Sequence, residues 1–167
     1  MKTIIVSGTP GTGKTTLAKK LSTKLGYYYI DVNKIISKYN LSEDYDRKRK
    51  TMIVDIKKLS TFLINYIKQL KNNKTNKKTS KIKGIIIDSH LSHYLPKKYV
   101  DLCIITKCNL KILKSRLKKR KYNNLKIKEN LESEIFNVCL NEALENKHNI
   151  IVIDTSKGVK NINIRSL

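Results

Sequence analysis

Gly8-Thr9-Pro10-Gly11-Thr12-Gly13-Lys14-Thr15 fits the phosphate-loop pattern G-x-x-x-x-G-K-[ST] without a mismatch. The apolar run Ile4-Ile5-Val6 precedes this stretch, and an amphipathic segment that stops at Gly26 follows it. The pattern needs a strand before it and a helix after it, because the loop aims backbone N–H groups and a helix N-terminus at phosphate oxygens. Both flanks are present, so the stretch predicts a nucleoside triphosphate site.

The residue types within this loop match the tasks of phosphate binding. Gly11 and Gly13 lack a Cβ, so the backbone can turn tightly and approach an anion closely. Lys14 would reach the β- and γ-phosphates, and the hydroxyl of Thr15 would ligate Mg²⁺. We therefore expect these residues to bind the magnesium-bound nucleotide.

Five apolar runs are typical of buried strands, and helical patterns fill the gaps between them. We expect strands at 3–6, 27–30, 84–87, 102–106 and 149–153. We expect helices at 14–25, 45–70, 110–119 and 125–144, and a short one through residue 39 that Asp31 caps. This alternation predicts an α/β fold of the P-loop NTPase kind, in which helices cover both faces of a five-stranded parallel sheet, within a single domain at 1–167.

The chain is strongly basic. Its 167 residues include 36 Lys and Arg but 13 Asp and Glu, a formal net charge of +23 at pH 7. Such a surface should attract polyanions such as nucleic acid or ribosomal particles. The abundance of lysine, asparagine and isoleucine could equally reflect a compositional bias, so both origins stay open. Segment 71–83 is lysine-rich and lacks acidic residues, which favours a solvated connector, with contact to RNA as the alternative.

Other functional classes are disfavoured. No run approaches the ~18 apolar residues of a membrane span, and the first residues are expected to form a strand rather than a signal peptide, so we expect a cytoplasmic protein. Cys103, Cys108 and Cys139 lack paired C-x-x-C spacing, which indicates buried reduced thiols rather than disulfides or zinc ligands.

A second candidate site follows the strand expected at 84–87. This strand delivers Asp88 to the carboxyl edge of the sheet, where open α/β sheets bind their ligands. An aspartate there would hold Mg²⁺ or its water shell. His90 could orient a water or contact the acceptor, or it could be hydrogen-bonded for structural reasons alone.

A basic stretch lies between Asp101 and Glu129, where no acidic residue occurs. Ten basic residues lie there: Lys107, Lys111, Lys114, Arg116, Lys118, Lys119, Arg120, Lys121, Lys126 and Lys128. Most of the lysines are expected to form a solvated face. Guanidinium groups stabilise a transferring phosphoryl group well, so Arg116 and Arg120, four residues apart on one helix face, are predicted catalytic clamps.

Together these residues resemble the nucleoside monophosphate kinases, and within them the adenylate kinase isoenzyme 6 family of archaea and eukaryotes. The elements that discriminate this family from other phosphate-loop enzymes are Asp88-Ser89-His90 and Arg116-Leu117-x-x-Arg120-x-Tyr122. The resemblance also includes the loop at 8–16, Asp31-Val32, Asp44-Tyr45-Asp46, Val54-Asp55, the continuation Leu91-Ser92-His93-Tyr94-Leu95-Pro96, Lys128-Glu129-Asn130 and Glu132-x-Glu134-Ile135.

The resemblance implies an ATP:AMP phosphotransferase that uses Mg²⁺ with ATP, on AMP or a broader set of monophosphates. It also implies ATP hydrolysis in late maturation of the small ribosomal subunit, at the 3′ end of 16S rRNA, through transient contact with ribosomal protein uS11. Carried over onto this chain, the resemblance adds Thr16 to the ATP site. It also implies that Arg120 closes over the ATP site from a short lid at about 118–128. It places Lys157 in an adenine-contacting loop and the monophosphate-binding segment at about 31–54.

The chain departs from the family at two places. Lys121 stands where the family usually has a glycine, and Lys34, Ser37 and Lys38 occupy a stretch that commonly carries an arginine. Alternatives therefore remain: a ribosome-assembly ATPase switch with vestigial kinase activity, or a P-loop kinase of another small molecule. A GTPase is disfavoured, because Asn109 replaces the aspartate of a guanine-reading Thr-Lys-x-Asp.

Overall fold

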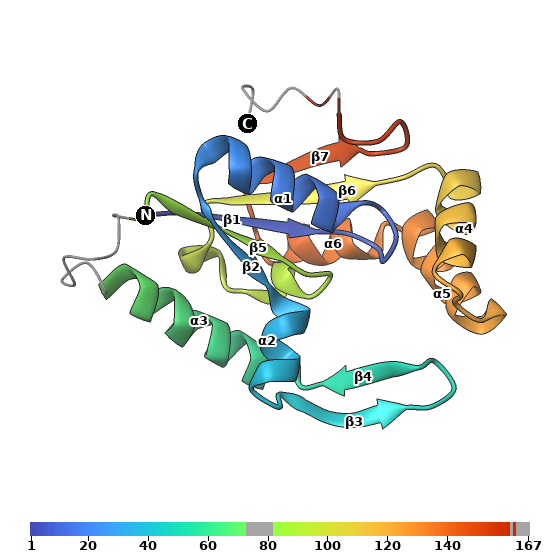
Figure 1. The fold of residues 1–167 in the computed structure, drawn as a ribbon, viewed down its shortest axis with the longest axis horizontal. Coiled ribbons are helices and arrows are strands. Elements are labelled where there is room, and N and C mark those ends of the chain that lie inside the picture. Colours follow the sequence, from blue (N-terminus) through green and yellow to red (C-terminus); the bar gives the residue numbers. More distant parts are fainter. Residues whose placement is uncertain (73–81, 161, 163–167) are drawn as a thin grey trace.

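A five-stranded parallel sheet forms the centre of the structure, a computed structural model that describes residues 1–72, 82–160 and 162 (Figure 1). The strands lie in the order β2-β5-β1-β6-β7. Their bounds are β1 Lys2–Ser7, β2 Tyr28–Asp31, β5 Gly84–Asp88, β6 Leu102–Lys107 and β7 Ile150–Asp154. Each begins and ends within one residue of the strand expected from the sequence, so the predicted sheet is confirmed.

The central strands have apolar middles because both faces of the sheet are covered. In the register of β1 with β5, Ile4 lies opposite Ile86 and Ile5 opposite Ile87. The odd and even residues of these strands enter two separate apolar clusters, one on each face. This pairing fixes the end of β5 beside the end of β1, where the phosphate loop begins.

Helix α1, Lys14–Leu25, covers one face of the sheet, and α3, Ile56–Asn72, and α6, Val138–Glu145, contribute to the cluster on the other. Helices α4, Leu110–Lys119, and α5, Asn124–Ile135, pack against each other in a third apolar cluster, beside the carboxyl ends of the strands (Figure 1). Two short 3₁₀ turns, η2 Ser92–Tyr94 and η3 Lys97–Tyr99, connect β5 to β6. Within the described residues, none of the helices has the length and apolar character needed to cross a membrane.

The helix predicted at 45–70 is wrong in its first part. Residues there form an antiparallel hairpin of β3, Ser42–Asp46, and β4, Thr51–Val54, and helix α3 begins only at Ile56. The boundary has a local cause: the side chain of Asp55 accepts hydrogen bonds from the backbone N–H groups of Lys57 and Lys58, at 2.7 and 3.1 Å. The buried stripe of α3 likewise begins beyond this cap.

The single helix predicted at 125–144 is also wrong, because the chain breaks it into α5 and α6. Asn137, which lies between them, has a left-handed backbone with φ 53°, a conformation that asparagine tolerates better than most residues. Ile127 of α5 packs in the cluster with α4, whereas Ala143 of α6 packs under the sheet. One apolar periodicity in the sequence therefore serves two differently directed helices.

The remaining helix predictions are confirmed. Helices α1 and α4 have the predicted bounds, and α2, Val32–Lys38, is capped by Asp31, whose side chain accepts from the N–H groups of Asn33 and Lys34. Most of the expected connector at 71–83 lies outside the described residues. Cys103, Cys108 and Cys139 are all buried free thiols.

Candidate active site

The phosphate loop joins β1 to α1 at the carboxyl edge of the sheet. Gly8 has φ 134°, and a Cβ added there would lie 2.5 Å from the carbonyl oxygen of Thr106 on β6. Gly13, with φ 94°, is the left-handed residue that precedes the first turn of α1. Glycine is required at both positions because other residues adopt such backbone angles at a cost, and at position 8 they would also clash.

Lys14 lies folded back into the loop. Its Nζ donates to the carbonyl oxygens of Gly8 and Thr9, at 2.7 and 2.9 Å. Burial lowers the pKa of Lys14 from 10.5 to about 8, against an opposing effect of nearby acidic groups such as Asp88. The side chain is still mostly charged at pH 7, and it is an ammonium group with little water around it.

Among the described residues, three cavities lie around the phosphate loop, and Lys14 lines the central one. The central cavity, about 220 Å³, lies directly over the loop. It is lined by eight of the predicted site residues: Gly11, Gly13, Lys14, Thr15, Thr16, Asp88, His90 and Arg120. The structure therefore brings together residues of the phosphate loop, α1, β5 and the predicted lid, some of them more than a hundred positions apart.

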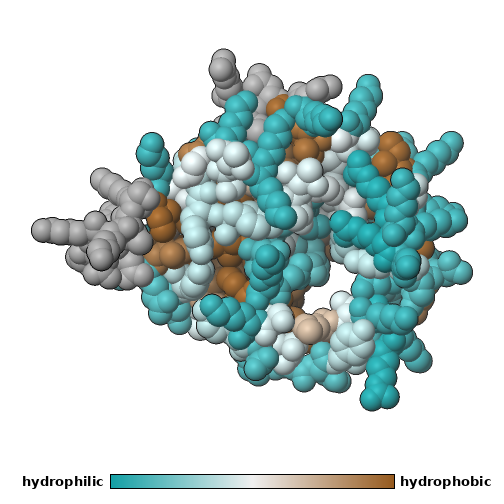
Figure 2. All heavy atoms as spheres, viewed as in Figure 1, coloured by the Kyte–Doolittle hydropathy of each residue, from teal (hydrophilic) through white to brown (hydrophobic). Residues whose placement is uncertain are grey.

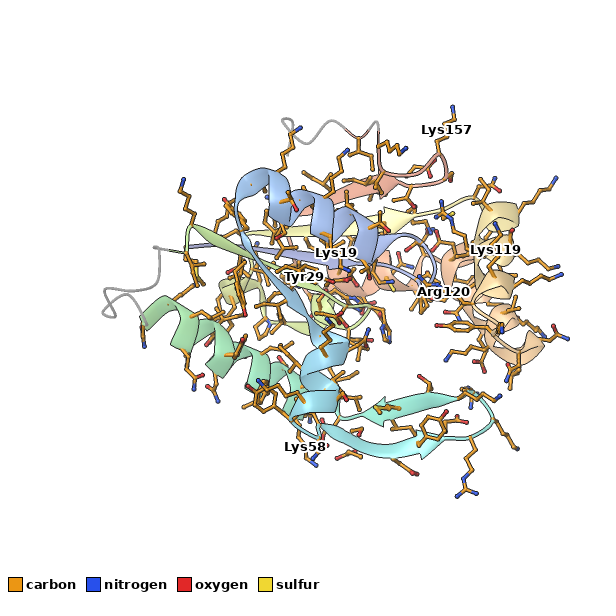
Figure 3. The ribbon with its side chains drawn as sticks, viewed as in Figure 1. Lys19, Tyr29, Lys58, Lys119, Arg120 and Lys157 are labelled. Atoms are coloured by element: carbon orange, nitrogen blue, oxygen red, sulfur yellow. The ribbon has the colours of Figure 1, made fainter. Side chains whose placement is uncertain are left out.

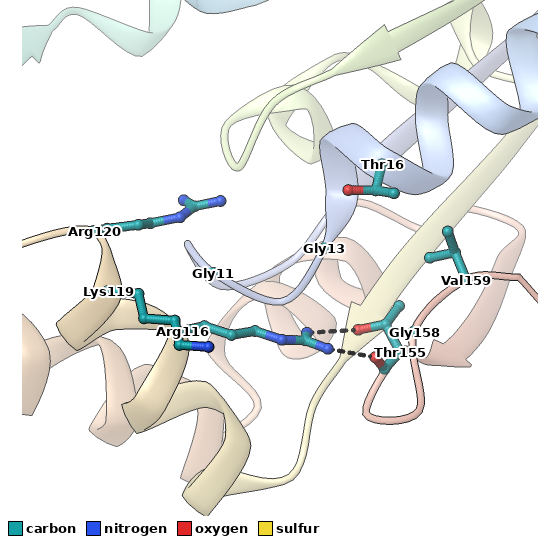
Figure 4. Close-up of a pocket in the computed structure, with 9 residues that line it drawn as sticks. All are labelled: Gly11, Gly13, Thr16, Arg116, Lys119, Arg120, Thr155, Gly158 and Val159. Atoms are coloured by element: carbon teal, nitrogen blue, oxygen red, sulfur yellow. Dashed lines mark hydrogen bonds between the residues drawn. The ribbon is translucent and has the colours of Figure 1, made fainter.

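The other two cavities flank the central one on opposite sides. The β7 cavity, about 380 Å³, shares Gly11, Gly13, Thr16 and Arg120 with it (Figure 4). The hairpin cavity, about 300 Å³, lies between the β3–β4 hairpin, the segment after β5 and helix α5. Figure 2 shows this face hollowed between the hairpin and the α4–α5 pair. The site thus has room on both sides of the phosphate loop.

Asp88 lies at the end of β5, as predicted. Its buried carboxylate accepts a hydrogen bond of 2.8 Å from the hydroxyl of Tyr29 on β2. Burial, together with this bond, raises the pKa of Tyr29 well above its ordinary value, so Tyr29 stays a neutral donor. Tyr29 was not among the residues predicted from the sequence. Its position two residues before the end of β2, the strand that pairs with β5, is the signal that could have indicated a contact with Asp88.

His90 lines both the central cavity and the hairpin cavity. Burial is the main cause that lowers its pKa to about 4, and the charge of Lys14 adds to the effect. The imidazole is therefore neutral at pH 7, and it can accept a hydrogen bond or orient a polar group without adding charge.

His93 serves a structural role behind the loop. Its Nδ1 is hydrogen-bonded to the Ser7 hydroxyl at 2.7 Å and its Nε2 to the carboxylate of Glu142 at 2.8 Å. Cys139 lies close to this pair, but both ring nitrogens of His93 are already bonded. The buried ring thus ties β1 to α6.

Arg116 of α4 and Arg120, which caps the end of α4, point to different places (Figure 4). Arg116 donates to the carbonyl oxygen of Thr155 at 2.8 Å and lies 3.4 Å from the Cys108 sulfur. Arg120 extends towards Gly11, and no hydrogen bond joins its guanidinium to the described residues. In this structure Arg120 faces the phosphate loop, as a clamp requires, whereas Arg116 holds the loop after β7.

The loop after β7 borders its cavity. Lys157 of this loop is exposed and points away from the cavity (Figure 3). The cavity is lined instead by Thr155, Gly158 and Val159. The Thr155 hydroxyl also donates to the carbonyl oxygen of Thr12, which ties this loop to the phosphate loop.

Glu134 on α5 braces the phosphate loop from behind. Its buried carboxylate accepts from the Thr9 hydroxyl at 2.6 Å and from the backbone N–H of Cys108 at 2.8 Å. Lys107 lies 3.1 Å from the same carboxylate. The sequence analysis quoted Glu134 within a motif but gave it no role; the structure shows that it joins α5 to the loop and to the end of β6.

The predicted lid consists of the last turn of α4, a turn at Lys121 and the first turn of α5. Lys121 adopts a left-handed backbone with φ 57°, and its N–H donates to the carbonyl oxygen of Lys118 at 2.8 Å. The turn that a glycine would favour is therefore retained with lysine, at a cost of roughly 1 kcal/mol. The lid is a tight helix–turn–helix corner.

Comparison with known proteins agrees with this architecture. A family model described as "AAA domain" matches residues 4–137. The chain is 38% identical over 160 residues to the "Putative adenylate kinase" of Methanocaldococcus jannaschii, covering 95% of this chain and 80% of that protein. It is 35% identical over 149 residues to the "Adenylate kinase isoenzyme 6 homolog" of Caenorhabditis elegans, covering 89% of this chain and 76% of that protein. The chain belongs to the adenylate kinase isoenzyme 6 family.

Solved structures share this fold. A structure described as a "putative kinase" from Chloroflexus aurantiacus superimposes with a TM-score of 0.57 at 14% identity, over 99% of this chain and 93% of that one. A sugar kinase from Janibacter superimposes with a TM-score of 0.53 at 18% identity, over 92% and 85%. The fold and the family together make this protein a nucleotide-binding kinase of the adenylate kinase kind.

Proposed function

We propose that this kinase transfers the γ-phosphate of MgATP to AMP. The observation that carries the proposal is the arrangement of the cavities, because the central cavity over the phosphate loop adjoins a second cavity on each side. Hydrolysis requires one nucleotide pocket and a water molecule. Transfer between two nucleotides requires two pockets whose phosphates meet at one point, which is what this arrangement offers.

The β7 cavity is the proposed site for the adenosine of ATP. The phosphates would extend from it over Gly11 and Gly13 to Lys14, in the direction of the N-terminus of α1. Thr155 and Gly158 would border the base, and Arg116 would act by holding their loop in place. The hairpin cavity, on the other side, is the proposed site for the nucleoside of AMP.

The oxygen atoms at the centre suit Mg²⁺. Thr15 offers an exposed hydroxyl, and Asp88 offers a carboxylate of which one oxygen is bonded to Tyr29. Oxygen donors of this type are the ones that Mg²⁺ prefers, directly or through its waters. When bound, Mg²⁺ would neutralise charge on the β- and γ-phosphates.

Positioning and charge neutralisation would perform the transfer, without a covalent enzyme intermediate. Lys14 would exchange its carbonyl partners in the loop for phosphate oxygens, and Arg120 would reach the transferring group from the lid. His90, held neutral, would orient the acceptor where the central and hairpin cavities join. Movement of the lid towards the loop would exclude water.

The test is ADP production from MgATP, alone and with AMP, GMP, CMP or UMP added, with Lys14→Ala as the blank. We expect strong stimulation by AMP in the native protein and a loss of about a thousandfold in the variant. If the variant folds and keeps the native rate, the assignment of the site is wrong.

We also propose slower ATP hydrolysis that serves ribosome maturation, as the resemblance implies. Two observations favour it: the lid is short, so it would exclude water poorly, and the net charge of +23 suits a partner rich in RNA. The test is whether purified uS11 or small-subunit particles raise ATP turnover when AMP is absent. No response to either would remove this second role.

A further inference from the structure

Lys126 lies at the junction of the two cavities through which an acceptor would meet ATP. Four residues line both the central cavity and the hairpin cavity: Pro10, Thr51, His90 and Lys126. Among these four, Lys126 is the only one with a permanently charged side chain. From the sequence, Lys126 was one of ten basic residues expected to lie mostly on a solvated face. In the fold it differs from most of them because it lines two cavities of the site.

The ammonium group of Lys126 is held in a defined position. The residue lies in the first turn of α5, where its backbone N–H donates to the cap residue Asn123 at 2.8 Å. Its Nζ donates to the carbonyl oxygen of Lys50 at 3.2 Å and lies 4.5 Å from the centre of the Tyr122 ring. One of the three N–H bonds of the ammonium is therefore used, and two remain for a ligand.

The tip of the hairpin is fastened to the same helix beside Lys126. The guanidinium of Arg49 lies 2.8 Å from the carboxylates of both Asp46 and Glu129. The side chain of Asn123 donates to the carbonyl oxygen of Lys48 at 2.6 Å. These bonds join the tip of the hairpin to α5 and the turn before it, beside the hairpin cavity that Arg49 and Glu129 line.

We propose that Lys126 binds the phosphate of the acceptor, so that the acceptor is a phosphate monoester rather than a free hydroxyl compound. The inference rests on the proposed function and refines it. Transfer requires the acceptor's phosphate to lie where the hairpin cavity opens into the central one, next to the γ-phosphate. A dianion at that point needs a cation within reach, and Lys126 supplies it.

The bond from Lys126 to Lys50 suggests a competing role, in which the lysine merely braces the hairpin. The two roles differ in what they predict for ligands. If Lys126 binds the phosphate, its loss should weaken the binding of AMP but not of adenosine, which lacks the phosphate. If Lys126 only braces the hairpin, its loss should affect the binding of both compounds alike.

The experiment measures the affinity for AMP and for adenosine by calorimetry in three proteins: the native chain, Lys126→Met and Lys128→Met. Methionine keeps an unbranched apolar stem, so contact with Tyr122 can persist. Lys128 is the matched control, because it lies on the same helix with a side chain 75% exposed, near Glu132. We expect Lys126→Met to weaken AMP binding about tenfold or more and to leave adenosine binding unchanged. Lys128→Met should change neither, and Lys126→Arg should restore part of the AMP affinity.

Two results would overturn the inference: unchanged AMP affinity in Lys126→Met, or an equal loss for AMP and adenosine. A native chain that binds AMP through Lys126 but forms no ADP from it would retain the inference and refute AMP phosphorylation. If the native chain phosphorylates AMP but Lys126→Met binds AMP as tightly as the native chain does, the proposed function is retained and the role of Lys126 is refuted.

Discussion

The proposed ATP side and the proposed acceptor side of this site are built differently. The phosphate loop follows the buried strand β1, and Glu134 and Thr155 bind it from behind. The acceptor side is walled by a hairpin whose apolar side chains Tyr45 and Met52 are 51% and 50% exposed, and whose tip is held by exposed ion pairs. The ATP side is thus preorganised by packing, whereas the acceptor side depends on a few solvated contacts that a ligand or salt can change.

The largest effect should come from removing the brace of the ATP side. Glu134→Ala takes away a buried carboxylate that accepts from Thr9 and Cys108 and lies beside Lys107. We expect the free energy of unfolding to fall by about 3 kcal/mol, because donors and a cation lose their partner. Urea denaturation measures this. Glu132→Ala, an exposed change on the same helix, is the control, and equal midpoints for the two variants would contradict the brace.

The next effect compares the two arginines of α4. Arg120→Ala should lower kcat about a hundredfold, since Arg120 faces the phosphate loop, where the transferring group is proposed to lie. Arg116→Ala should mainly raise the KM for ATP, because Arg116 holds the loop at Thr155. Steady-state kinetics with ATP as the varied substrate separate the two. A fall in kcat alone for Arg116→Ala would restore it as a direct clamp.

A smaller effect concerns pH and the ATP side alone. The folded pKa of Lys14 is lowered to about 8, so the ammonium loses its proton as pH rises through 8. We therefore expect the KM for ATP to rise above pH 8. The free energy of unfolding should increase over the same range. Between pH 8 and 10.5 the unfolded chain binds more protons at this lysine than the folded chain does, so a rise in pH favours the folded state. A KM for ATP that stays flat to pH 10 would contradict the burial of this lysine.

The smallest effect should lie on the acceptor side. Arg49→Ala removes the exposed pairs with Asp46 and Glu129, each worth about 0.2–1 kcal/mol. We expect the KM for AMP to rise a few fold and the unfolding midpoint to change little. High salt should produce the same rise in the native protein and less in the variant. A large loss of stability would mean that the hairpin is part of the folded core.

The same contrast explains what the sequence could predict. Buried parallel strands such as β1 and β5 need continuous apolar runs, and the phosphate loop needs its glycines, so both were evident from residue types. The hairpin has no comparable signal, since its apolar residues are half exposed and its tip is fixed by Arg49 and Glu129, eighty positions apart. Most of it, residues 45–54, was mistaken for the first part of a helix, although Asp55 marks the true beginning of α3.

The candidate site divides in the same way. Lys14 was predictable from the phosphate-loop pattern, and Asp88 from its place at the end of β5. The different contacts of Arg116 and Arg120, the proposed base-side role of Thr155 and the junction position of Lys126 depend on where α4, α5 and the loop after β7 meet. Spacing along one helix showed that the arginines share a face, but not what that face contacts.

The central claim is that the two sides act together in transfer between nucleotides. The most direct measurement follows the label of [γ-³²P]ATP in a single turnover, with and without AMP. The account predicts that with AMP most of the label appears in ADP, and that Lys14→Ala abolishes this. Label that appears in inorganic phosphate alone, at the same rate with and without AMP, would contradict it and leave an ATPase.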